Sequence, residues 1–215
     1  MTKSIYSLVL DDEVVAAVDR MAYAQNMSRS AMINHLLARE AGLSTRQMRT
    51  RDIFQRVEEL LTGDMLFSLG APSESAFQMR SALRYKYNPT VRYTVALGTD
   101  GGSLGELRVS VRSRSDAFTL AMLQFFRLWE KLEQAYVGAV DVKFEPNRLT
   151  RRLTPHDKAT GLAAETIDAD ALAAYIGAFD SAMKEFFGSL DSPAAAAEAA
   201  EARLAEYVRS NRILM

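Results

Sequence analysis

The sequence contains no cysteine and only two histidines. Without cysteine the chain can form no disulfide bond, no thiolate metal site and no cysteine nucleophile. His35 and His156 stand in neither a metal-ligand spacing nor the arrangement of a catalytic triad. The glycines form no phosphate-binding loop between a strand and a helix. We therefore expect no bound metal, no other cofactor and no enzymatic activity.

Long apolar runs are also missing, since no segment approaches the roughly 20 apolar residues that span a membrane. The start of the chain lacks the pattern of a secretory leader. The 215 residues carry a formal net charge of −1, which is ordinary for a globular protein. We expect a cytoplasmic protein without membrane contact, long enough for a small module and one larger domain.

At its start the sequence shows a change of hydrophobic period. Tyr6, Leu8 and Leu10 alternate with their neighbours, which predicts a half-buried strand. Apolar residues then recur at helical spacing, and Ser28 is placed to cap a second helix. Residues 1–43 therefore predict a strand, a helix, a tight turn and another helix. The apolar positions that we select on the two helices are Val14, Val18, Ile33, Leu36 and Leu37.

A strand of this kind has no partner within its own segment. A second copy of the chain can supply one, with the two strands antiparallel about a twofold axis. This arrangement resembles the ribbon-helix-helix family of DNA-binding proteins (CopG, Arc and MetJ type), over about the first fifth of the chain. The motifs that carry the resemblance are the Leu10-Asp11 junction, Val18-Asp19-Arg20-Met21-Ala22 and Ser28-Arg29-Ser30-Ala31-Met32-Ile33.

The resemblance implies a prokaryotic, homodimeric transcriptional regulator, most simply a repressor, whose paired strands enter the major groove of double-stranded DNA. It assigns the base-facing side of the strand to Ile5, Ser7 and Val9. It assigns phosphate binding to the start of the second helix and to the preceding arm, namely to Ser28, Arg29, Ser30 and Lys3. It assigns the dimer core to Tyr6, Leu8, Leu10, Val14, Val18, Ile33, Leu36 and Leu37.

The side chains of Ile5 and Val9 favour an alternative, and the charge of the module limits the DNA affinity that we expect. Ile5 and Val9 can contact only thymine methyl groups, whereas the family usually places long polar side chains there. Residues 1–43 hold four cations and five acids, so we expect this module alone to bind DNA weakly. Arg56 and other arginines just downstream would extend its cationic surface. The alternative hypothesis is an interaction protein that uses the module only to dimerise, while the rest of the chain binds a protein or an anionic partner.

The remaining chain predicts a basic connector and helix at residues 44–62 and an α+β domain at residues 63–215, which makes the fold class α+β. Short turns between the strands imply an antiparallel sheet with one buried face. Alternating apolar residues predict those strands at 77–87, 91–97, 107–111 and 140–144. Residues 148–152 predict a basic loop. Further helices are expected to begin after Ser115, Asp168 and Ser192.

The polar positions of the predicted strands and turns are rich in cations: Arg80, Arg84, Lys86, Arg92, Arg108 and Arg112. Like charges opposite one another destabilise a sheet. This face is either solvated and neutralised by acids elsewhere, or it is a platform for an anionic partner. The sequence leaves both interpretations open. Aromatic residues alternate onto the opposite face, so we do not expect the base-stacking platform of RNA-binding sheets.

Overall fold

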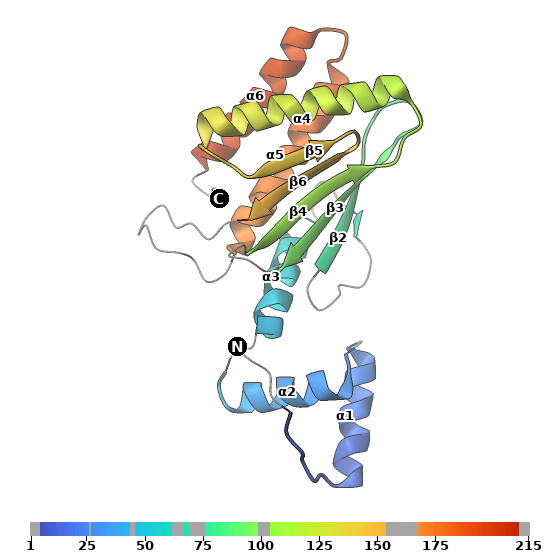
Figure 1. The fold of residues 1–215 in the computed structure, drawn as a ribbon, viewed down its shortest axis with the longest axis vertical. Helices are drawn as coiled ribbons and strands as arrows, with labels where there is room; N and C mark the ends of the chain where they lie inside the picture. The colour runs from blue at the N-terminus through green and yellow to red at the C-terminus, as the bar shows by residue number, and fades with distance from the viewer. Residues whose placement is uncertain are drawn as a thin grey trace. The chain divides into compact units, whose positions relative to one another are not determined.

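The structure is a computed structural model, and it divides into two compact units, Met1–Arg49 (unit 1) and Thr50–Met215 (unit 2). Figure 1 shows the elements of both units. The structure describes residues 5–25, 27–43, 46–61, 67–68, 76–98, 104–153 and 167–210. Among these residues, no helix is both long and apolar enough to cross a membrane.

Unit 1 contains the helices α1 (Asp12–Ala24) and α2 (Arg29–Glu40). The backbone N–H of Ala31 donates a hydrogen bond of 3.2 Å to the hydroxyl of Ser28, which confirms the predicted cap. Between the two helices lies a small apolar cluster, and its buried members are Val18, Ala22 and Met32.

The strand predicted at Tyr6 to Leu10 is not formed in the single chain, where residues 5–11 belong to neither a helix nor a strand. Tyr6 is 81% exposed and Leu8 is 59% exposed. A strand requires a ladder of hydrogen bonds to a second strand. The described part of unit 1 supplies none. Unit 1 therefore shows the two expected helices without the expected ribbon.

Unit 2 is organised around a six-stranded antiparallel sheet in the order β1-β2-β3-β4-β6-β5. The predicted α+β class with an antiparallel sheet is confirmed. Figure 1 shows the neighbouring strands β2, β3, β4, β6 and β5 side by side. The strands are β1 (Phe67–Ser68), β2 (Ala76–Ala82), β3 (Thr90–Leu97), β4 (Gly105–Val111), β5 (Val142–Glu145) and β6 (Arg148–Leu153).

Two strand predictions need correction. Residues 148–152 were predicted as a basic loop, but they form most of β6. Asn147, at φ 64°, makes the tight turn from β5, and Leu149 and Leu153 alternate onto the buried face. The first predicted strand is also too long. It ends at Ala82, and the chain then turns through residues 87 and 88, both of which have positive φ.

The helices of this part of the chain are α3 (Arg46–Leu61), α4 (Asp116–Tyr136), α5 (Ala169–Gly188) and α6 (Pro193–Arg209). The predicted starts of α4, α5 and α6 are confirmed. Ser115 and Asp168 cap α4 and α5 through side-chain oxygens, and proline opens α6. The helix predicted within residues 44–62 is formed, but it begins already at Arg46, and its Phe54, Val57 and Leu61 belong to the core of unit 2.

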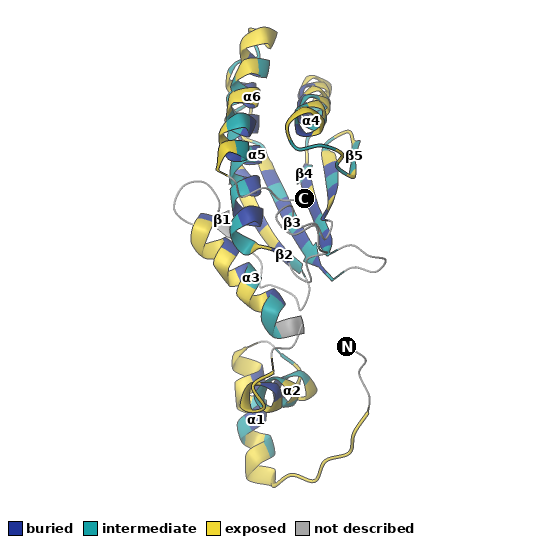
Figure 2. Ribbon diagram, turned by 90° about the vertical axis from the view of Figure 1, so that its left-hand side faces the viewer, coloured by how far each residue is buried: buried dark blue, intermediate teal, exposed yellow. Residues whose placement is uncertain are grey.

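The core of unit 2 lies between one face of the sheet and the helices. Its centre is Phe179 on α5, whose ring is 5.1 Å from that of Trp129 and 5.3 Å from that of Phe125, both on α4. The ring of Tyr93 on β3 reaches Phe179 from the sheet at 6.3 Å. Buried and less buried residues alternate along the strands, as Figure 2 shows. The odd-numbered side chains of β2, β3 and β4 face the helices, and the even-numbered ones form an open face.

Candidate functional site

The open face of the sheet concentrates positive charge. The even-numbered positions of β2, β3, β4 and β6 and the odd-numbered positions of β5 hold six cations against two acids, Glu106 and Glu145. The chain has 26 cations and 27 acids, of which six cations and five acids lie in residues 1–49. Unit 2 therefore holds 20 cations and 22 acids. A unit with excess acid therefore presents a cationic surface. We call this surface the basic face, and its cations are Arg80, Arg92, Arg108, Lys143, Arg148 and Arg152.

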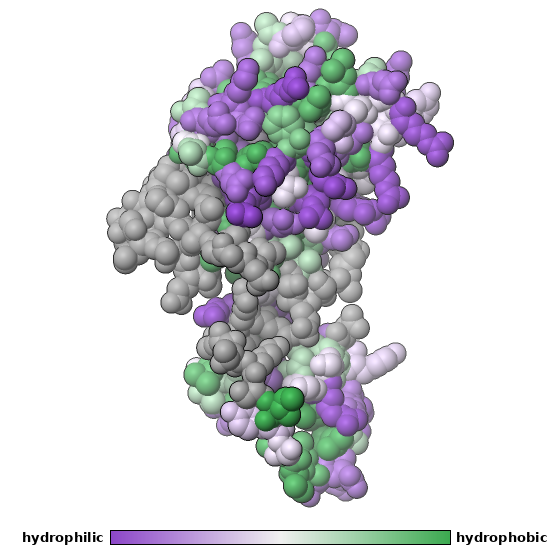
Figure 3. Space-filling view, viewed as in Figure 1, coloured by the Kyte–Doolittle hydropathy of each residue, from purple (hydrophilic) through white to green (hydrophobic). Residues whose placement is uncertain are grey.

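The register of the strands places cations next to one another on this face. Arg80 lies directly opposite Arg92, Arg92 opposite Ser110, and Ser110 opposite Arg148. One row across four strands therefore carries three arginines. In Figure 3 hydrophilic side chains gather over the part of unit 2 where Figure 1 shows β4, β5 and β6.

Half of these cations have a carboxylate partner. Arg108 pairs with Glu106, Arg148 with Glu145 at 3.8 Å, and Arg152 with Asp141 at 3.5 Å. Within the part of the chain that the structure describes, no ion pair is made by the other three, Arg80, Arg92 and Lys143.

The structure places only half of the predicted cations on the strands of this face. Arg80, Arg92 and Arg108 lie on it, whereas Arg84, Lys86 and Arg112 are exposed in the segments that follow β2 and β4. An open depression at the end of β4 is lined by Val111, Arg112, Ser113, Arg114 and Asn147. The cations that β5 and β6 add to this face were not predicted from the sequence. The alternation of Leu149 and Leu153 with polar residues was the signal that could have revealed them.

Unit 1 places the predicted phosphate-binding residues at the start of α2, with Arg29 already paired. Its guanidinium donates two hydrogen bonds of 2.6 Å to the carboxylate of Asp19 on α1. These bonds lower the pKa of Asp19 and raise the pKa of Arg29. Ser28 and Ser30 are exposed, and Lys3 lies outside the described residues. An incoming phosphate would therefore compete with Asp19 for Arg29.

The predicted base-facing residues Ile5, Ser7 and Val9 are all exposed. The predicted dimer-core residues fall into two groups in the single chain. Val18 is buried, and Ile33 and Leu36 are partly buried against it. The other members are exposed, namely Tyr6, Leu8, Leu10, Val14 and Leu37.

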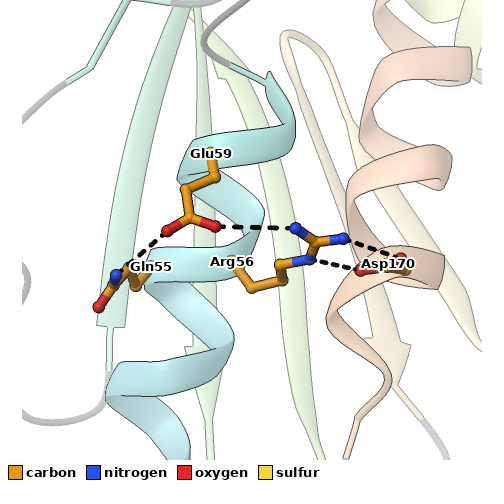
Figure 4. A network of polar contacts seen from close by, with 4 residues as sticks. All are labelled: Gln55, Arg56, Glu59 and Asp170. Carbon is orange, nitrogen blue, oxygen red and sulfur yellow. Dashed lines mark hydrogen bonds and ion pairs between the residues drawn. The ribbon is translucent and has the colours of Figure 1, made fainter.

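Arg56 of unit 2 is already ion-paired within that unit. Its guanidinium donates hydrogen bonds of 2.9 and 3.4 Å to Asp170 of α5, and it lies 3.7 Å from Glu59. Gln55 in turn donates to Glu59 at 3.1 Å. Figure 4 shows this network, which links α3 to the start of α5. The expectation that Arg56 extends a DNA-binding surface is therefore not supported by its contacts.

A second polar network is enclosed in the core of unit 2. Arg151 of β6 donates a hydrogen bond of 3.0 Å to Glu133 of α4, and the side chains of both are 1% exposed. Tyr175 donates to the other carboxylate oxygen at 3.0 Å and accepts from the indole N–H of Trp129 at 2.9 Å. The guanidinium of Arg151 also lies 4.6 Å from the centre of the Tyr175 ring. Such enclosure favours a structural role.

Burial raises the pKa of Glu133, opposed first by the charge of Arg151 and then by hydrogen bonds from Tyr175, Arg151 and Trp129. The same burial raises the pKa of Tyr175 well above its ordinary value. This buried network was not predicted from the sequence. Arg151 occupies a core-facing position of β6, and an arginine between two alternating leucines was the available signal.

Among the described residues, no group of three or more histidine, aspartate or glutamate side chains is arranged to hold a metal ion. Comparison of the chain with protein-family models, curated proteins and solved structures gives no match.

Proposed function

We propose that the chain is a DNA-binding transcriptional regulator, most simply a repressor, that acts as a homodimer through a ribbon-helix-helix module in residues 1–43. The observation that carries this proposal is the exposure of the apolar residues assigned to the dimer core. In the described part of unit 1 only Val18, Ala22, Met32 and Ala38 are buried hydrophobic residues. A unit of this size buries too little surface to be stable alone.

A second copy of the chain fits this exposed surface. Two copies would bring together ten exposed side chains, five from each chain: Tyr6, Leu8, Leu10, Val14 and Leu37. At about 1.5 kcal/mol for each buried side chain, the gross gain is roughly 15 kcal/mol. That gain is comparable with the largest estimates of the entropic cost of association. Pairing of residues 5–10 in the two chains would also satisfy their backbone N–H and C=O groups.

The DNA contacts follow from the same arrangement. If Tyr6, Leu8 and Leu10 face the dimer core, Ile5, Ser7 and Val9 face the major groove, because side chains alternate along a strand. The N-terminus of α2 offers free N–H groups to a phosphate beside Ser28 and Arg29. Weak binding is expected because Asp19 already occupies Arg29.

The test is a selection of bound fragments from a genomic library over a series of salt concentrations. A regulator should enrich one short palindromic or repeated site, with affinity that falls steeply as salt rises. Arg29→Ala should weaken binding to every sequence. Salt-sensitive background without an enriched site would refute a sequence-specific regulator.

The second candidate is a dimeric interaction protein that does not read DNA. The bidentate pair of Arg29 and Asp19 and the apolar side chains of Ile5 and Val9 favour it. This protein would form the same dimer, but Arg29→Ala would change neither DNA binding nor partner binding. The two functions are therefore distinguished by the effect of one substitution.

A further inference from the structure

The basic face contains an unfavourable contact that the described fold does not relieve. Arg80 and Arg92 are directly paired residues of an antiparallel ladder, and like charges in that position destabilise a sheet. Neither makes an ion pair with any residue that the structure describes. A bound anion would convert this repulsion into attraction to both arginines.

The dimensions of the face suit a polyanion better than a single small anion. Neighbouring strands lie about 4.8 Å apart, so the row from Arg80 on β2 to Arg148 on β6 spans about 14 Å. Over about 14 Å of axis, double-stranded DNA carries about eight phosphate charges. Three cations of the face make no ion pair with a described residue, so this length of duplex provides more than enough phosphates to neutralise them.

The chemistry of the face also indicates which form of nucleic acid it can hold. Single-stranded nucleic acid is usually bound by stacking its bases on aromatic side chains. On β2 to β6 the aromatic residues Phe77, Tyr93 and Phe144 point to the side of the helices. Within β2 to β6 the open face offers charge without aromatic residues, which suits a duplex that displays its phosphates and conceals its bases.

We propose that the basic face of unit 2 binds the phosphate backbone of double-stranded DNA without reading its sequence. The choice of DNA as the duplex rests on the function proposed for unit 1, whereas the phosphate-binding character of the face does not. Such contacts would add sequence-independent affinity to a module whose own net charge is unfavourable.

The experiment compares two double variants of the full-length chain on a random-sequence DNA duplex. Arg80→Gln with Arg92→Gln removes two cations of the face and breaks no ion pair among the described residues. Arg127→Gln with Lys131→Gln removes two exposed cations of α4 and is the control for net charge. A third variant, Arg80→Lys with Arg92→Lys, keeps both charges. Affinity is measured from low salt to about 0.2 M salt.

The face variant should bind at least about tenfold more weakly at 0.1 M salt, and its plot of log K against log salt should be flatter by about 1.8. The control and the lysine variant should bind like the unchanged protein. Because the substitutions remove a repulsion, the face variant should melt no earlier than the unchanged protein. This measurement separates lost binding from lost folding.

Equal binding by the face variant and the unchanged protein would overturn the inference. Absence of any binding of the unchanged protein to duplex DNA at low salt would overturn it too, as would tighter binding to duplex RNA. The proposal for unit 1 is tested separately by Arg29→Ala in the same assay. If only Arg29→Ala weakens binding, the face is not used. If only the face variant does, unit 1 does not bind phosphate.

Discussion

The ion pair between Arg151 and Glu133 supports a sharp prediction about unit 2. Replacing Arg151 by Met removes the cation, keeps most of the side-chain volume and leaves the carboxylate of Glu133 enclosed. At the observed separation of 3.0 Å, an effective dielectric constant of about 20 gives an attraction of about 5 kcal/mol. Breaking a buried pair by removing one partner typically costs about 3–5 kcal/mol. We expect Arg151→Met to lose stability in that range at neutral pH.

The loss should depend on pH. Burial already holds the pKa of Glu133 above its ordinary 4.5, and the charge of Arg151 is the first of the effects that limit the rise. Without Arg151 the pKa rises further. A carboxyl group with a raised folded-state pKa contributes stability that is fully present below about 4.5 and is lost as pH rises through the folded pKa. The deficit of Arg151→Met should therefore be smallest in mild acid and grow toward neutral pH.

The assay is unfolding in urea between pH 4.5 and 7.5, followed by the fluorescence of Trp129, the only tryptophan of the chain. Arg152→Met is the matched control, because its neighbouring guanidinium is 55% exposed and pairs with Asp141 at 3.5 Å. An exposed pair contributes about 0–1 kcal/mol, so the control should stay close to the unchanged protein. A deficit below about 1 kcal/mol for Arg151→Met, or one that is constant with pH, would show that the buried charge of Glu133 does not depend on Arg151.

Two further predictions concern two other ion-paired carboxylates, Asp19 and Asp180. Asp19→Asn releases Arg29 from its bidentate partner and removes a negative charge beside the predicted phosphate site. The affinity for DNA should therefore rise several-fold in a binding titration. Weaker binding would contradict the assigned role of Arg29. Tyr93→Phe removes the hydroxyl that donates a hydrogen bond of 2.8 Å to the buried carboxylate of Asp180, whose second oxygen is 2.7 Å from the ammonium of Lys184. This substitution should lower the free energy of unfolding in denaturant by about 1–3 kcal/mol. The control Tyr87→Phe, at a residue that is 98% exposed, should leave it almost unchanged. Equal losses would show that the buried hydrogen bond contributes little.

The elements that the sequence predicted well are those set by local chemistry. Ser28, Ser115 and Asp168 act within three residues of themselves, so their helix starts could be located from sequence alone. The three central strands followed from an alternation that one buried face imposes. The strand β6 was not predicted, because residues 148–152 are rich in arginine and one arginine, at a core-facing position, interrupts the alternation of apolar residues.

The parts of the candidate sites that could not be predicted depend on contacts between distant residues. The burial of Arg151 is explained only by its ion pair with Glu133, which lies on another element. The position of Arg80 opposite Arg92 depends on the register of the two strands. Arg29 was predicted as a phosphate ligand, but its contact with Asp19 requires the packing of α1 against α2. The predicted strand at Tyr6 to Leu10 is not formed in the single chain, and it would require a partner strand from outside the described part of unit 1.

The most direct test of the dimeric module is the molecular mass in solution of three full-length proteins: the unchanged chain, Leu8→Asp and Val9→Asp. These neighbouring residues are 59% and 102% exposed in the single chain, and the proposed ribbon would turn them to opposite sides. We expect the unchanged chain and Val9→Asp to have twice the 23.9 kDa mass of one chain, and Leu8→Asp to be monomeric. An unchanged chain that is monomeric at high concentration, or two variants that behave alike, would contradict the proposed ribbon.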